Sequence, residues 1–203
     1  MTAVNDSSDE LLRRIQRVDE AAFLTLYRQL QAPIYRFGLH MTGSPAAAED
    51  VTQEVFLALL SGNCAFDPER GTLNGYLFGV ARKLVLRYLE RNRSAGEQDL
   101  DNADWSYSEA PAHPDVMLDL LRRESIEGLR RAVLSLPKRY REVVVLCDLE
   151  EMDYTEAADV LGCPIGTIRS RLHRARGLLL EKLQQAADRT AAIPGLKPVR
   201  SLI

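Results

Sequence analysis

The chain has 203 residues, enough for one large domain or two small ones. Its formal net charge of -3, with 27% charged and 46% apolar residues, is ordinary for a soluble protein and excludes one that binds DNA with its whole surface. Three cysteines without CxxC spacing argue against a zinc site and a disulfide framework. The N-terminus is polar and no apolar run reaches membrane-spanning length, so we expect a cytoplasmic protein.

Helical periodicity begins near the N-terminus. Ser7 and Glu10 have the spacing of a capping box, which predicts the start of a helix that runs towards residue 31. Pro33 marks a break or a kink, and residues 34–41 continue as helix. The pattern therefore favours an all-α fold from the first residues onward.

A third helix is predicted over residues 46–60, because Ser44 can cap it and Pro45 suits its first position. One side of this helix is apolar and packs on the core. On the other side a leucine stands among carboxylates, which indicates a protein partner, although an ordinary acidic helix with one exposed leucine explains the pattern equally well. The residues of this outer side are Asp50, Gln53, Glu54 and Leu57.

Residues 61–71 are rich in loop-forming types and carry Phe66, and a fourth helix is predicted over residues 72–92. The outer side of this helix is basic, through Arg82, Lys83 and Arg87. Basic residues beside an aromatic ring suit unpaired DNA, on which bases can stack. Cations that stabilise the helix C-terminus are the alternative, but this explains residues in mid-helix less well.

Residues 94–114 differ from the rest of the chain. This segment has five acidic residues, two prolines and no lysine or arginine, so it is predicted to be an acidic linker between two domains. Helical periodicity resumes at residue 115 and continues through a second domain to residue 185. Residues 186–203 are predicted to be a flexible tail.

The second domain contains a helix-turn-helix pattern. A short helix is predicted over Tyr154–Leu161, followed by Gly162 as a left-handed cap and Pro164 at the start of a second helix that reaches about residue 183. The outer side of the second helix is small, hydroxylic and cationic, which suits the major groove of DNA. A solvated surface helix is the alternative, but no acidic residue lies between Gly162 and Leu180 to pair with the arginines. The candidate DNA contacts are Thr167, Arg169, Ser170, Arg171, His173 and Arg174.

Taken in order, these motifs resemble the extracytoplasmic-function (ECF) sigma factors of the sigma-70 family. The matching stretches are DEAAFLTLY at 19–27, AEDVTQEVF at 48–56, YLFGVAR at 76–82, LP at 136–137 and GTIRSRLHRAR at 166–176. The resemblance implies two helical domains: sigma region 2 over residues 1–93 and a region 4 helix-turn-helix domain over residues 115–185.

The resemblance also implies roles for the three surfaces. The Asp50, Gln53, Glu54 and Leu57 side of the third helix would dock on the largest subunit of RNA polymerase. Phe66, Arg82, Lys83 and Arg87 would open and recognise the minus-ten element of the promoter. The second helix of the helix-turn-helix would recognise the minus-thirty-five element. At three positions the chain departs from the residues common in the family, namely Tyr76, Lys83 and Arg87. These differences affect which minus-ten sequence would be recognised and leave the overall role unchanged.

The expected partners are core RNA polymerase, promoter DNA and, as is common in the family, an anti-sigma factor. An autonomous helix-turn-helix regulator that binds duplex DNA as a dimer is the alternative, and it should protect a palindromic site by itself. An enzyme is not expected, because the three histidines are scattered and no phosphate loop, nucleophile elbow or metal-ligand spacing occurs. We expect no cofactor and no metal.

Overall fold

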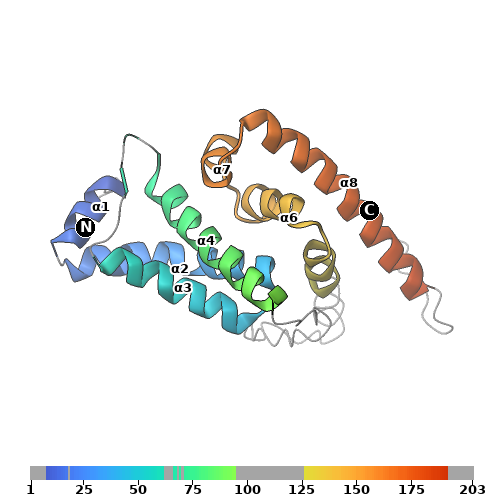
Figure 1. Ribbon diagram of the computed structural model, residues 1–203, viewed down its shortest axis with the longest axis horizontal. Helices are drawn as coiled ribbons and strands as arrows, with labels where there is room; N and C mark the ends of the chain where they lie inside the picture. The colour runs from blue at the N-terminus through green and yellow to red at the C-terminus, as the bar shows by residue number, and fades with distance from the viewer. Residues whose placement is uncertain are drawn as a thin grey trace, which may run out of the picture.

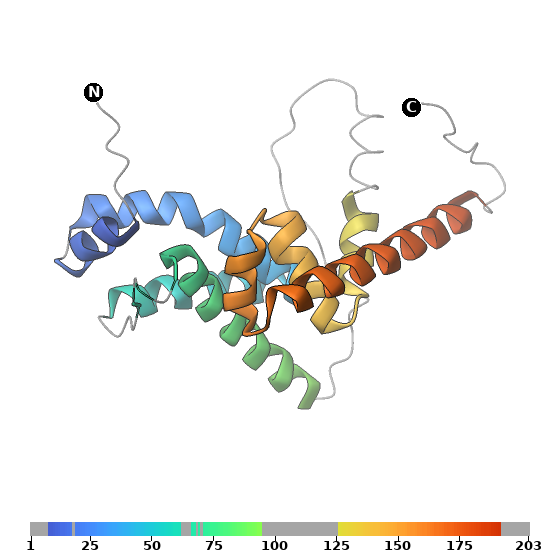
Figure 2. The same cartoon turned by 90° about the horizontal axis from the view of Figure 1, so that it is seen from above.

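The computed structural model describes residues 8–17, 19–61, 66–67, 69, 71–94 and 126–191, and every regular element in these ranges is a helix (Figure 1). The all-α fold predicted from the sequence is therefore confirmed. We call the described residues up to Ser94 the first module and residues 126–191 the second module. The two modules lie side by side (Figures 1 and 2). The predicted acidic linker, residues 94–114, lies outside the described residues except for Ser94, which is helical.

The first module is a bundle built on a long central helix. Its core is fully buried at Phe37, Met41, Val55 and Leu77. Figure 2 shows the bundle at one end of the molecule, with the second module packed against it. Its helices are α1 (Ser8–Gln16), α2 (Glu20–Thr42), α3 (Pro45–Leu60) and α4 (Leu73–Ser94).

A break after α1 corrects the sequence-based expectation of one helix up to residue 31. Asp19 caps α2, and its carboxylate accepts a hydrogen bond from the Ala22 backbone N–H at 3.1 Å. The same carboxylate pairs with Arg14 at 2.8 Å, and this hydrogen bond lowers the pKa of Asp19. Asp19 is thus a local stop and start signal, because an aspartate at this position satisfies the free N–H groups of the next helix.

The connection between α2 and α3 has the predicted chemistry. α2 continues through Pro33, where a break or a kink was expected, and it ends at Gly43, whose φ of 75° is left-handed. The Ser44 hydroxyl then accepts from the Ala47 N–H at 3.2 Å, with Pro45 at the first helical position. This tight turn sets α3 against α2, so the outer side of α3 faces away from the core.

The second module contains the helix-turn-helix. Residues 126–134 are helical, and they precede α6 (Lys138–Val144), the π-helix η3 (Val145–Leu149), α7 (Tyr154–Leu161) and α8 (Ile165–Ala191). α8 is longer than the sequence predicts and includes residues 186–191 of the expected tail. The reason is composition, because residues 184–187 are Gln-Gln-Ala-Ala, all good helix formers. Residues 192–203 lie outside the described residues.

Arg141 is a buried residue of the second module that is hydrogen-bonded to the first. This residue lies on α6 and is only 9% exposed. Its guanidinium donates hydrogen bonds to the carbonyl oxygen of Met41 at 2.7 Å, to that of Leu136 at 3.1 Å and to that of Leu134. Met41 belongs to the last turn of α2, so the second module is bonded directly to the first. Burial lowers the pKa of Arg141 to about 10, which leaves the side chain charged at neutral pH.

Candidate functional site

The helix-turn-helix is held by a cap at each end of α7, of which the sequence predicts the one at Gly162. Asp153 precedes α7 and accepts hydrogen bonds from the N–H groups of Thr155 at 2.7 Å and Glu156 at 2.9 Å. Gly162 ends α7 with a φ of 63°, and the turn leads directly into α8. The left-handed glycine fixes the angle at which α8 leaves α7.

Burial on α8 separates a core side from an outer side. Ile168, Leu172 and Ala175 are at most 2% exposed and pack on the core of the second module. The predicted DNA contacts lie on the other side of the helix, away from this core. Of these, Arg169, Ser170, His173 and Arg174 are exposed, while Thr167 and Arg171 are half-buried.

Arg169 and Arg174 are exposed to an external anion, whereas Arg171 is half-buried and donates to Cys163 Sγ at 4.0 Å. In the described ranges, Arg169, Arg171 and Arg174 form no ion pair with a carboxylate. Arg176 does form one, because Asp148 on η3 accepts from its Nη2 at 2.6 Å and its Nε at 3.1 Å. The sequence argument that the α8 arginines lack carboxylates is therefore wrong for Arg176. The acid comes from another helix, which spacing along α8 does not reveal.

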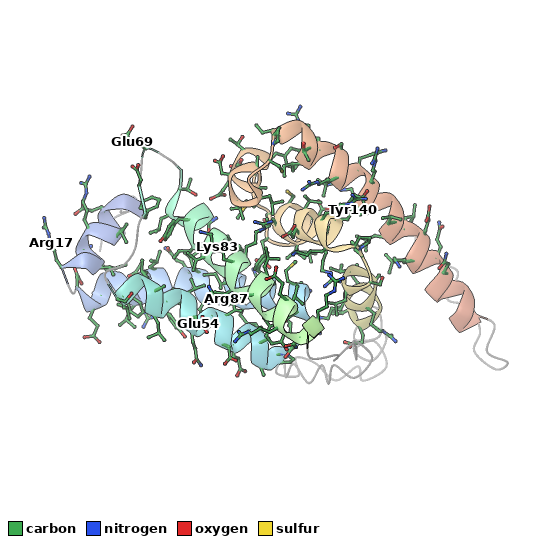
Figure 3. All side chains as sticks on the ribbon, in the orientation of Figure 1. Arg17, Glu54, Glu69, Lys83, Arg87 and Tyr140 are labelled. Atoms are coloured by element: carbon green, nitrogen blue, oxygen red, sulfur yellow. The ribbon has the colours of Figure 1, made fainter. Side chains whose placement is uncertain are left out.

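Tyr140 supports the same surface and was missed in the sequence. Its side chain lies between α6 and α8 and is 8% exposed (Figure 3). A hydrogen bond from Arg174 and the nearby charge of Arg139 lower the pKa of the Tyr140 hydroxyl. The Arg139 guanidinium also lies 4.7 Å from the centre of the tyrosine ring, a cation–π distance. Tyr140 therefore holds two exposed cations next to each other.

The basic side of α4 is only partly free. Lys83 and Arg87 are exposed and lie along one side of α4 in Figure 3. Arg82, the residue before Lys83, pairs through its Nε with Glu142 of the second module at 2.8 Å. Its side chain is 25% exposed and that of Glu142 only 5%. This contact corrects the expectation that the whole basic side would face nucleic acid.

Phe66 does not lie on the open surface. It is half-buried and its ring meets that of Tyr76 edge-on, with 5.7 Å between ring centres. Both rings line a cavity of about 510 Å³ between the modules. Arg82 and Lys83 line the same cavity. The structure thus brings together Phe66 and two of the three basic residues proposed for unpaired DNA.

The outer side of α3 is exposed as predicted. Asp50, Gln53 and Glu54 all face solvent, and Glu54 points away from the core in Figure 3. Leu57 is 63% exposed and Leu60, which the sequence analysis did not single out, is 53% exposed. Two exposed leucines beside three polar residues form an apolar patch with an acidic border. We call these five residues the α3 surface.

A metal-binding site is not evident in the described ranges. No cluster of three His, Cys, Asp or Glu side chains there could hold a metal ion. Cys147 is a poor nucleophile, because burial raises the pKa of its thiol to about 11. Among the helices that the structure describes, none is long and apolar enough to cross a membrane.

Comparison with known proteins agrees with this geometry. The family model described as Sigma-70 region 2 matches residues 26–95, and that described as Sigma-70, region 4 matches residues 126–179. The chain is 31% identical over 189 residues to the ECF RNA polymerase sigma factor RpoE of Cereibacter sphaeroides, covering 91% of this chain and 98% of that relative. It is 33% identical over 168 residues to the ECF RNA polymerase sigma factor SigE of Mycolicibacterium smegmatis, covering 82% of this chain but only 63% of that relative.

A solved structure shares the fold. It is that of the sigma factor RpoE in complex with the anti-sigma factor NepR from Bartonella quintana, with a TM-score of 0.59 and 25% identity. The match covers 80% of this chain and 96% of that one. Both modules therefore have counterparts in known proteins.

Proposed function

The chain belongs to the ECF sigma factors of the sigma-70 family, and we propose that it binds core RNA polymerase and directs it to promoters. The observation that carries this function is the exposed cationic side of α8, which follows a helix-turn-helix and keeps Arg169, Arg171 and Arg174 free of carboxylates within the described residues. The α3 surface, on the other module, supplies a place for a protein partner.

Each domain has a proposed part in this function. Residues 1–93 would act as region 2, residues 94–114 as the linker, residues 115–185 as region 4 and residues 186–203 as a tail. Two DNA contacts and one protein contact on one chain bind cooperatively, because each bound contact raises the effective concentration of the others. The mechanism uses binding energy and no bond chemistry, which agrees with a family role without catalysis.

We assign minus-thirty-five recognition to α8. Small Thr167 and Ser170 let the helix enter the major groove, and Arg174 can donate two hydrogen bonds to a guanine edge. The remaining cations of that side would neutralise phosphates. The proximity of Arg174 to the Tyr140 hydroxyl, which lowers the pKa of that hydroxyl, supports this assignment, because it places the arginine beside a buried side chain before DNA arrives.

We assign minus-ten recognition to α4 and the residues before it. Lys83 and Arg87 are exposed, while Phe66 and Tyr76 line a cavity of about 510 Å³. Removing a base from a duplex costs a few kcal/mol, which contacts in such a cavity can offset. Arg82 lines the same cavity, and its Nε is paired with Glu142.

We assign polymerase binding to the α3 surface. Apolar side chains next to carboxylates fit a protein partner with an apolar groove and a basic border. The protein would act in the cytoplasm, together with polymerase and promoter DNA. The relation to the NepR complex supports an anti-sigma factor as a further partner.

A transcription assay tests this function. Purified chain and core polymerase are mixed with a library of promoter fragments, and transcripts and footprints are recorded. We expect promoter-specific transcripts and sharp protection only when both proteins are present. Protection of a palindrome by the chain alone, with no effect of polymerase, would instead favour the dimeric regulator.

The α3 surface has a matched test. Glu54→Lys should weaken core polymerase binding, because it reverses a charge at the edge of the exposed leucines. Glu20→Lys, an exposed acid on α2 of the same module, is the control. Equal polymerase affinity of the two variants would remove the assignment of this surface.

A further inference from the structure

Two arginines from different helices meet at the side chain of Tyr140. The Arg139 guanidinium of α6 lies 4.7 Å from the centre of the tyrosine ring. Arg174 of α8 lies near the hydroxyl, close enough to lower its pKa. Tyr140 itself is 8% exposed and lies between α6 and α8 (Figure 3). One nearly buried side chain is therefore in contact with two exposed cations.

These cations have no counter-charge within the part of the chain that the structure describes. Arg139, Arg174 and the neighbouring Lys138 are all exposed, and none of them pairs with a carboxylate there. Arg176, only two positions after Arg174, is neutralised by Asp148. Like charges held near one another repel, and a neutral tyrosine between them removes none of the charge. Such a cluster favours an external anion that both guanidiniums can bind.

A packing role alone does not explain this arrangement. A cation–π contact accounts for the position of Arg139 over the ring. It does not require a second cation beside the hydroxyl of the same tyrosine, where Arg174 adds repulsion. The pair is thus better explained by a ligand than by the stability of α6.

The place of the pair on the fold indicates which anion it would bind. α6 packs against α8, so its first turn brings Arg139 next to the outer side of α8. A recognition helix in the major groove has a phosphate backbone on each side of it. Guanidinium groups bind phosphate oxygens through charge-assisted hydrogen bonds. A cation beside the recognition helix is therefore suited to the backbone that borders the groove.

We propose that Arg139 is a further DNA contact outside the helix-turn-helix: it binds a backbone phosphate beside the base pair that Arg174 contacts, and Tyr140 is a positioning residue for both arginines. The proposal rests on the proposed assignment of α8 to the minus-thirty-five element. The tyrosine ring holds Arg139 and the hydroxyl holds Arg174, so removal of the hydroxyl alone should affect base selectivity and leave the phosphate contact intact.

Binding is measured on the holoenzyme formed from the full chain and core polymerase. The probes are duplex fragments that the wild-type holoenzyme selects from a random library. Each is paired with a copy in which one base pair of the shared upstream element is substituted. Affinity is recorded over a range of salt concentrations, because its salt dependence reports the number of phosphate contacts. The affinity ratio of the paired probes reports base selectivity.

Arg139→Gln should lower affinity by about eightfold at ~0.1 M salt, since counterion release gives one phosphate contact about that weight. The slope of log affinity against log salt should become shallower by about 1, equally on both probes of a pair. Arg139→Lys should keep most of the affinity, because lysine also binds phosphate. Arg131→Gln removes an exposed charge from the helix over residues 126–134 and is the control, which should change neither readout.

Tyr140→Phe should lower the affinity ratio of the paired probes by about fivefold, the usual effect of one lost polar contact, and leave the salt slope unchanged. Tyr140→Leu also removes the ring and should reduce both readouts. Circular dichroism and core polymerase affinity verify that each variant folds. Equal effects of the two Tyr140 variants on ratio and slope would refute the positioning role.

The remaining outcomes separate this proposal from the proposed function. If Arg139→Gln matches Arg131→Gln while the wild-type holoenzyme selects fragments, the phosphate contact is wrong and the function stands. A change in the ratio of the paired probes without a change in slope would make Arg139 a base contact, which also contradicts the proposal. If the wild-type holoenzyme selects no fragment, the proposed function fails, and the DNA contact on α6 fails with it.

Discussion

Replacement of Arg141 by methionine should destabilise the protein by about 3 kcal/mol. The guanidinium is buried and donates to the carbonyl oxygens of Met41, Leu134 and Leu136. Methionine fills similar space but leaves these three acceptors unpaired, at roughly 1–3 kcal/mol each. The net loss is smaller than the sum of these three penalties for two reasons. The variant no longer buries a positive charge that has no carboxylate partner, and Nε of Arg141 already lacks a hydrogen-bond partner among the described residues.

The position of these carbonyls gives the guanidinium its counter-charge. Met41 is in the last turn of α2 and Leu134 ends the helix over residues 126–134, so both belong to negative helix ends. Arg141→Lys should fall between wild type and Arg141→Met, because an ammonium group cannot span three carbonyls as a planar fork does.

Urea unfolding followed by circular dichroism measures this loss. Lys138→Met, an exposed site on the same helix, is the control and should change the free energy of unfolding by less than about 0.5 kcal/mol. A midpoint for Arg141→Met equal to that of Lys138→Met would refute the reasoning. It would mean that water or backbone relaxation satisfies the three carbonyls without the guanidinium.

Three further predictions concern α8, the pH dependence of stability and the turn of the helix-turn-helix. Arg174→Ala should reduce minus-thirty-five selectivity by about 1–3 kcal/mol in promoter binding with core polymerase, and Tyr140→Phe by a smaller amount; an equal loss on every sequence would make Arg174 a phosphate contact. Burial, with Arg130 and Arg36 nearby, lowers the pKa of His40 from 6.5 to about 4. Between these two pH values the unfolded chain binds a proton at His40 that the folded chain does not bind, so the free energy of unfolding should be lower by about 2 kcal/mol near pH 5 than at neutral pH. His40→Asn should abolish this pH dependence in urea titrations. Gly162→Ala should cost about 1–2 kcal/mol because alanine is strained at the φ of 63°, whereas Gly177→Ala within α8 should be neutral or stabilising in the same unfolding assay.

Signals that act over a few residues were predictable from the sequence. The Ser44–Pro45 start of α3, the α7 bounds and the left-handed Gly162 are all confirmed, since caps and turns depend on neighbours in the chain. The break at Asp19 was equally local, and it was missed because apolar residues continue at helical spacing on both sides of it.

Contacts between distant residues could not be predicted in this way. Arg82 and Glu142 are 60 positions apart, and periodicity identifies each only as the polar side of its own helix. Tyr140 was missed for the same reason, because its importance comes from Arg174 on another helix. Site residues on one helix were thus found from the sequence, while their internal partners needed the structure.

The acidic net charge now has a structural explanation. A DNA-binding chain with a charge of -3 must keep some carboxylates away from its DNA contacts. Asp148, Glu142 and Glu150 each pair with an arginine of another helix, and Asp50 and Glu54 lie on the α3 surface. Glu150 and Glu142 pair with Arg36 and Arg82 across the modules, whereas Arg169, Arg171 and Arg174 of α8 pair with no carboxylate in the described ranges. The two cationic helices therefore differ in their availability, because the outer side of α8 is exposed whereas Arg82 of α4 is paired with Glu142.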